Sequence, residues 1–81
     1  MPKILTFLVE VDNGNGTSSP LASITTKVHR VTTAADVATV STDANGYFPQ
    51  TTVAGSAGET FRVRVENYQG RAGWYEVNSV P

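Results

Sequence analysis

The sequence contains no cysteine among its 81 residues. Neither a disulfide nor a thiolate-bound metal can therefore stabilise this fold. The chain also has a single histidine, a single tryptophan and a single methionine. One histidine and scattered carboxylates make a poor ligand set for a transition metal. We therefore expect a protein without a metal site or a cofactor.

Charged residues are few and nearly balanced, with six Lys and Arg against seven Asp and Glu. Such a chain offers no basic field to hold a phosphate backbone, which argues against a nucleic-acid partner. The longest apolar stretch, residues 4–11, contains Thr6 and Glu10 and is far shorter than the ~20 residues of a membrane span. Because no small-residue cleavage site follows it directly, it is also a poor signal peptide. We expect a protein made in the cytoplasm, with no membrane partner.

Catalytic residues in a recognisable arrangement are missing as well. A hydrolase triad would need His29, yet no serine stands in a nucleophile elbow with flanking glycines. Glu59 with Glu66, or Asp36 with Asp43, are nominal carboxylate pairs, but residues of this kind in a β-sandwich are more often turn and surface residues. We therefore expect that the protein is not an enzyme.

Short runs of β-branched and aromatic residues alternate with Gly, Pro and Asn, and no segment shows a period of 3.6 residues. This pattern predicts an all-β chain. At 81 residues it is long enough for one domain with one modest core. We predict a single β-sandwich of about seven strands over residues 1–81. The main predicted strands cover residues 4–11, 24–31, 37–42, 47–53, 59–67 and 74–78.

The clearest predicted strand alternates apolar and charged residues. Phe61, Val63 and Val65 fall on the face that should point into the core, and Arg62 and Arg64 fall on the other. The charged stripe is either a solvated sheet face with weak cross-strand pairs or a rim that selects a partner by charge.

Two polar stretches interrupt the predicted strands. Asp43-Ala44-Asn45-Gly46 predicts a tight hairpin turn, because Asp and Asn hydrogen-bond their own backbone and Gly tolerates a positive φ. Residues 12–20 are rich in Gly, Asn and Ser and predict a flexible, solvated loop. This loop lacks the acidic ligands of a calcium loop, so we expect no calcium there.

A resemblance rests on the order of features from residue 20 onward. These are Pro20-Leu21-Ala22, a strand and a turn, the strand 37–42, the turn 43–48, Val53-Ala54-Gly55, and the strand Phe61-Arg62-Val63-Arg64-Val65. This order resembles the carboxypeptidase-regulatory-like and collagen-adhesin B-type domains, which are small transthyretin-like, Ig-like Greek-key sandwiches. The resemblance implies a Greek-key fold and a role as spacer, stalk unit or adhesion module rather than catalyst.

The chain departs from that family in two ways. The turn before Phe61 is longer and richer in Gly and Ser than the family's short form. The collagen-adhesin B-type family often carries a Lys–Asn isopeptide bond beside a buried acid, and no residue here stands in a matching motif. The conceivable partners are Lys3 or Lys27, Asn67 or Asn78, and Glu59 or Glu66.

The best interaction candidates lie between residues 68 and 75. Tyr68, Arg71, Trp74 and Tyr75 gather there, and Trp, Tyr and Arg dominate the energetics of protein interfaces. Trp74 and Tyr75 point to opposite faces of a strand. We expect one of the two to be buried in its own subunit and the other to be exposed or covered by a neighbour.

Two functions follow as hypotheses. The first is a structural protein that assembles through symmetric protein–protein contacts into a homo-oligomer or polymer. A bacteriophage virion accessory protein (capsid decoration, fibre or tail) combines a surface-module fold, synthesis in the host cytoplasm and sheet edges open to strand addition. The second is a carbohydrate-binding or adhesive module of a larger extracellular surface protein, with Tyr68, Trp74 and Tyr75 as the platform.

Overall fold

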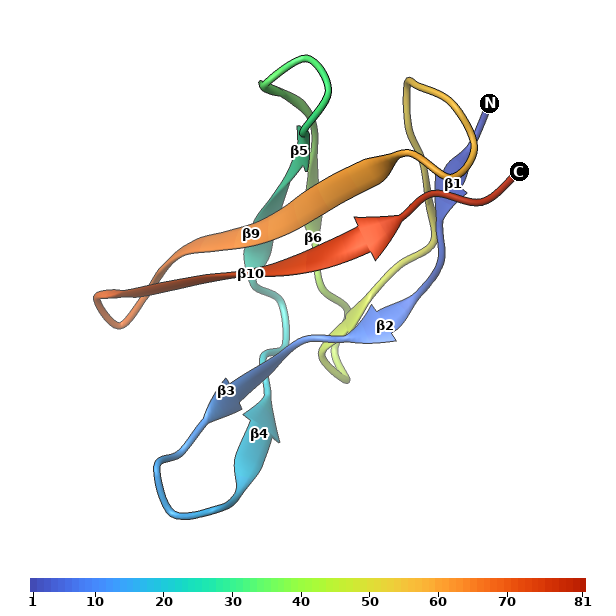
Figure 1. Cartoon of the computed structure of the whole chain (residues 1–81). Coiled ribbons are helices and arrows are strands. Elements are labelled where there is room, and N and C mark those ends of the chain that lie inside the picture. Colours follow the sequence, from blue (N-terminus) through green and yellow to red (C-terminus); the bar gives the residue numbers. More distant parts are fainter.

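A computed structural model describes the backbone of residues 1–81 and every side chain except those of Glu66, Asn67 and Arg71. The described backbone is all-β and contains no helix (Figure 1). The strands in chain order are β1 (Lys3–Ile4), β2 (Phe7–Leu8), β3 (Glu10–Asp12), β4 (Ser18–Pro20), β5 (Thr25–Arg30), β6 (Ala35–Ser41), β7 (Tyr47–Phe48), β8 (Thr51–Thr52), β9 (Thr60–Tyr68) and β10 (Arg71–Asn78).

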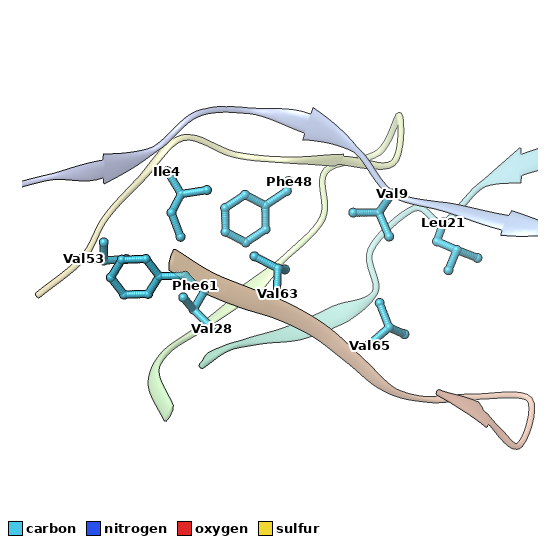
Figure 2. Packing of buried hydrophobic residues seen from close by; sticks show 9 residues of the cluster. All are labelled: Ile4, Val9, Leu21, Val28, Phe48, Val53, Phe61, Val63 and Val65. Carbon is cyan, nitrogen blue, oxygen red and sulfur yellow. The ribbon is translucent and has the colours of Figure 1, made fainter. Parts of the chain in front are cut away.

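The strands form two layers around one core. Strands β10, β9, β5 and β6 make a four-stranded antiparallel sheet in that order. Opposite it run β1, β2 and β3, which pair in turn with β8, β7 and β4. Figure 2 shows the apolar side chains filling the space between the two layers. The buried cluster consists of Ile4, Val9, Leu21, Val28, Phe48, Val53, Phe61, Val63 and Val65.

The inner face of the four-stranded sheet follows the predicted alternation. Phe61, Val63 and Val28 are completely buried, as the period of two requires. Thr26 is buried among them and satisfies its hydroxyl by donating to the Val40 carbonyl at 2.6 Å. The strand predictions for residues 24–31, 37–42 and 59–67 are confirmed within two residues at each end.

The single strand predicted over residues 4–11 is wrong. Three short strands replace it, because the chain changes partner twice, from β8 to β7 to β4. At the first break Leu5 is half exposed, and the Thr6 hydroxyl donates to the Phe48 carbonyl at 2.6 Å. The partner run 47–53 is divided as well, since Pro49 has no N–H to continue the ladder beyond Phe48.

The tight turn at residues 43–46 is confirmed, but the hairpin is not. Asp43 Oδ1 accepts the backbone N–H groups of Asn45 at 2.8 Å and Tyr47 at 3.0 Å, and Gly46 has a φ of 88°. The strands on either side of this turn do not pair with each other. Strand β6 belongs to the four-stranded sheet, whereas β7 pairs with β2. The turn therefore carries the chain from one layer to the other.

Residues 12–20 form most of a β-hairpin, so the prediction of a loop there is wrong outside the turn itself. Strand β3 pairs with β4 in the register Val11↔Ser19. The Asn13 amide donates to Thr17 Oγ1 at 3.2 Å and to Ser19 Oγ at 2.9 Å. Polar side chains thus bond to one another across the hairpin, where an apolar alternation would have marked strands in the sequence.

The connection between the predicted strands 59–67 and 74–78 is also shorter than expected. Gln69 and Gly70 have φ values of 50° and 75°, which is the signature of a two-residue type I′ turn. This turn matches the twist of the flanking strands, so β10 begins at Arg71 instead of residue 74.

The first and last residues of the chain lie side by side. Lys3 and Val80 exchange two backbone hydrogen bonds of 2.8 and 2.9 Å. The turns of the β3–β4 and β9–β10 hairpins lie at the other end of the molecule (Figure 1). The hairpin ends are therefore presented away from the termini.

Candidate functional site

Trp74 and Tyr75 point to opposite faces of β10, as predicted. The Trp74 side chain lies on the outer face of the four-stranded sheet and is 54% exposed. Tyr75 is half-buried, and its ring lies 5.2 Å from the ring of Phe7, centroid to centroid. Trp74 is therefore the aromatic side chain that this strand offers to solvent.

The outer face around Trp74 is organised by its cationic residues. The Arg62 guanidinium lies over the Trp74 ring, 4.5 Å from its centroid. Arg64 Nη2 donates to both carboxylate oxygens of Asp36 at 2.8 Å, and His29 Nδ1 lies 3.1 Å from Asp36 Oδ1. The hydrogen bond with His29, helped by the Arg64 charge, holds the pKa of Asp36 below its ordinary value. The predicted charged stripe thus makes two separate interactions on this face, Arg62 with the Trp74 ring and Arg64 with Asp36.

A groove of about 420 Å³ lies between the β3–β4 hairpin and the β9–β10 hairpin. Its apolar lining includes Leu21 and Val65, the two most exposed members of the core cluster at 7% each. Gly73 lies opposite Val65 in the register of β9 and β10. An added Cβ at Gly73 would meet no heavy atom within 4 Å, so the missing side chain leaves this part of the groove open. The lining residues are Glu10, Val11, Asp12, Leu21, Val65, Tyr68, Ala72, Gly73, Trp74 and Tyr75.

The two strands beside the groove have open edges. Within the described chain β3 pairs only with β4, and β10 pairs only with β9. The Tyr75 hydroxyl links them by accepting the Glu10 N–H at 3.0 Å. A side chain, and not a backbone ladder, therefore joins the two layers at this end.

The structure brings three of the four predicted interaction residues together. Tyr68, Trp74 and Tyr75 all contribute to the groove, while the side chain of Arg71 lies outside the described residues. Sequence reasoning missed the wall formed by residues 10–12, because it depends on where two distant hairpins lie. Gly73 was a usable signal, since a glycine inside a strand often marks a place where another group approaches.

The Glu59 carboxylate is held by hydrogen bonds from two neighbouring residues. Its carboxylate accepts two bonds from Arg30, Nε to Oε1 at 2.5 Å and Nη2 to Oε2 at 3.1 Å, and a third from the Ser56 N–H at 2.9 Å. These hydrogen bonds lower the pKa of Glu59 to about 2, and those from Arg30 have the largest effect. A carboxylate held by Arg30 does not match the acid that the collagen-adhesin cross-link requires. The side chains of Glu66, the alternative acid, and of Asn67, one of the two candidate asparagines, lie outside those that the structure describes.

The described residues include no group of three or more His, Asp or Glu side chains placed to hold a metal ion. None of them belongs to a helix that is long and apolar enough to cross a bilayer. No protein-family model, curated protein or solved structure matches the chain. The family resemblance therefore stays a prediction from the sequence.

Proposed function

We propose that this chain is a non-catalytic structural protein that acts by assembling with other protein subunits. The observation that supports this most is Trp74, exposed on the outer sheet face beside the open edge of β10. Tryptophan and arginine are the residues most enriched at interface hot spots, and Arg62 stacks on this ring. A partner that covers Trp74 would bury a large aromatic surface already held in one orientation.

Assembly would use the open strand edges together with this face. An unpaired edge offers a row of backbone donors and acceptors to a second chain. Each contact is small for a domain of this size, so many copies would be needed to give a firm attachment through avidity. Closed symmetry gives a ring, and a repeated head-to-tail contact gives a polymer.

The concrete form that we propose is a bacteriophage virion accessory protein for capsid decoration, a fibre or a tail. The two termini lie together, and the two hairpins lie at the opposite end of the molecule. This arrangement suits a module that is attached to a particle at one end and exposes the other. For the fold we propose the transthyretin-like, Ig-like Greek-key type. The sheet order β10-β9-β5-β6 and the turn that carries the chain from β6 to β7 in the other layer support it.

The test is native mass spectrometry of the pure chain over a concentration series. We expect a defined oligomer or a ladder of polymers that grows with concentration. Proteomics of particles released by lysis of the producing cells tests the virion proposal, which expects this chain among the particle proteins. A monomer at every concentration would contradict the assembly proposal. Absence of the chain from such particles would contradict the virion proposal.

A carbohydrate-binding or adhesive module is the second candidate. It is favoured by the groove, whose 420 Å³ and three aromatic residues fit a small-ligand site. It is weakened by the engagement of two of those rings, since Tyr75 packs on Phe7 and Trp74 on Arg62. A glycan array tests it: saturable hits that Trp74→Ala abolishes would favour this candidate.

A further inference from the structure

We propose that Asn15, in the turn of the β3–β4 hairpin, is a site of spontaneous covalent modification that converts its side-chain amide to a carboxylate. The Gly16 backbone nitrogen is the nucleophile, and solvent water is the other reactant. The sequence offers this chemistry at three Asn-Gly steps, at residues 13–14, 15–16 and 45–46. The geometry of the fold favours the second of them. This inference does not depend on the proposed assembly function.

The reaction has two steps. In the first, the Gly16 nitrogen attacks Asn15 Cγ and closes a succinimide ring, while the bond from Cγ to Nδ2 breaks. The proton lost by the Gly16 nitrogen leaves with Nδ2, which departs as ammonia. In the second, water adds to either carbonyl carbon of the ring and breaks its bond to the nitrogen. The products are aspartate, or isoaspartate with the main chain running through the former side chain, and nothing is oxidised or reduced.

The attacking N–H group is hydrogen-bonded at two of the three steps. The Gly14 N–H donates to Asp12 Oδ1 at 2.9 Å, and the Gly46 N–H donates to the Asp43 carbonyl at 3.1 Å. No described residue accepts a hydrogen bond from the Gly16 N–H. A nitrogen that already donates must give up that bond before it attacks. The nucleophile is therefore ready only at the step from Asn15 to Gly16.

The carbonyl that is attacked at Asn15 is polarised by Thr17. Asn15 Oδ1 accepts the Thr17 N–H at 3.2 Å and the Thr17 hydroxyl at 2.5 Å. Negative charge develops on this oxygen as the nitrogen attacks, so the two donors stabilise the transition state.

Asn13 is held in the opposite sense. Its Nδ2, which would be the leaving group, donates to Thr17 Oγ1 at 3.2 Å and to Ser19 Oγ at 2.9 Å. Among the described residues no donor reaches its Oδ1. The same hydroxyl of Thr17 therefore anchors the amide of Asn13 and activates the amide of Asn15.

The hairpin turn also has room to change its backbone path. Gly14 and Gly16 have φ values of 81° and 83°, and an added Cβ at either would meet no heavy atom within 4 Å. Isoaspartate lengthens the main chain by one methylene, which an exposed turn can accommodate. Gly46 is buried, and a Cβ there would lie 2.7 Å from the Pro20 Cβ. The packed turn at residues 43–46 therefore resists both the ring and the longer chain.

The products change the hairpin in charge and in shape. Either product adds a carboxylate to a turn that already carries Asp12. Isoaspartate also lengthens the turn that the Asn13 N–H closes by donating to the Thr17 carbonyl at 3.0 Å. The end of the molecule opposite the termini thus carries a slow, irreversible change (Figure 1).

The test compares the three Asn-Gly steps within one chain. The folded wild type is incubated at neutral pH beside the same chain in urea, and peptide mapping that separates aspartate from isoaspartate follows each step. We expect conversion at Asn15 to be at least fivefold faster than at Asn13 and Asn45 in the folded chain. In urea, where the hydrogen bonds are lost, we expect similar rates at all three.

Thr17→Val tests the polarised carbonyl, because it removes the hydroxyl that donates to Asn15 Oδ1. We expect conversion at Asn15 to slow at least threefold. Thr17→Ser keeps the hydroxyl and is the matched control, with a rate near that of the wild type. Position 17 is exposed, and amide NMR spectra check that the hairpin is retained in both variants.

Several outcomes would overturn the inference. Equal conversion at the three steps in the folded chain, or faster conversion at Asn13 or Asn45, would overturn the choice of site. So would no conversion at Asn15 in the folded chain while the chain in urea reacts there. Equal rates in Thr17→Val and the wild type would overturn the role of Thr17. Because the reaction takes place within one chain, its result and that of the assembly test are independent.

Discussion

The Arg30 guanidinium clamps the Glu59 carboxylate through two hydrogen bonds, and so ties β5 to the turn before β9. The Ser56 N–H adds a third bond to the same carboxylate. Because these donors favour the charged form, the pKa of Glu59 falls from 4.5 to about 2 in the folded chain. This contribution to stability is complete above the unfolded pKa and is lost as the pH falls toward 2.

We therefore expect Glu59→Gln to lower the melting temperature at pH 7 and to flatten its fall between about pH 4.5 and 2. Thermal melts by circular dichroism over this range measure both effects. Glu76→Gln, at an exposed position on β10, is the control and should keep the wild-type profile. Identical acid profiles for Glu59→Gln and the wild type would show that the clamp contributes no stability.

The buried hydroxyl of Thr42 predicts a larger loss on replacement by valine than by serine. It donates to the Leu21 carbonyl at 2.6 Å and accepts the Ile24 N–H at 2.9 Å. Thr42→Val keeps the shape but leaves two buried backbone groups without this partner, at a cost of about 1–3 kcal/mol. Thr42→Ser keeps the hydroxyl and serves as the control. Urea denaturation measures the difference, and equal stabilities would contradict it.

Two glycines with similar φ values separate backbone strain from a steric clash. Gly46 and Gly58 have φ values of 88° and 83°. A Cβ at Gly46 would lie 2.7 Å from the Pro20 Cβ, whereas at Gly58 it meets nothing within 4 Å. We expect Gly58→Ala to cost about 1–2 kcal/mol from the left-handed backbone, and Gly46→Ala clearly more. Equal losses of stability for Gly46→Ala and Gly58→Ala in urea denaturation would show that the chain around Pro20 shifts to make room for the added Cβ.

Phe61 should be among the most costly core positions. Its side chain is completely buried in the space between the layers. Phe61→Ala is expected to cost about 3–5 kcal/mol, which leaves little of the stability of a small domain. Val31→Ala, at a 40% exposed position, should stay within about 0.5 kcal/mol. A folded Phe61→Ala variant with unchanged urea midpoint would contradict this core assignment.

Local sequence patterns correctly predicted the features that depend only on residues close together in the chain. The alternation of Phe61, Val63 and Val65 identified the buried face, and the Asp43 side chain with Gly46 identified a tight turn. The same turn pattern predicts a hairpin that the structure does not contain, because the pairing of β7 with β2 is a long-range relationship. Residues 4–11 are predicted as one strand for the same reason. Their apolar character does not show that the segment pairs with three different strands in turn.

In the candidate site, too, local features could be predicted from the sequence and long-range ones could not. Tyr68, Trp74 and Tyr75 were predicted from their residue types, and the opposite directions of the last two from the strand period. The position of the wall at residues 10–12 could not be predicted, because its pairing partner β4 lies in residues that the sequence presents as a polar loop. The pairing of that hairpin depends on polar contacts such as Asn13 to Ser19.

The central claim is that Trp74 and the edge beside it mediate assembly. Sedimentation velocity of the wild type, Trp74→Ala and Tyr47→Ala over one concentration series tests it most directly. Tyr47 is the matched control, since it is an aromatic residue 43% exposed on the other layer. The account predicts concentration-dependent association for the wild type and Tyr47→Ala, and a monomer for Trp74→Ala. Association of Trp74→Ala equal to the wild type, or monomers throughout, would contradict it.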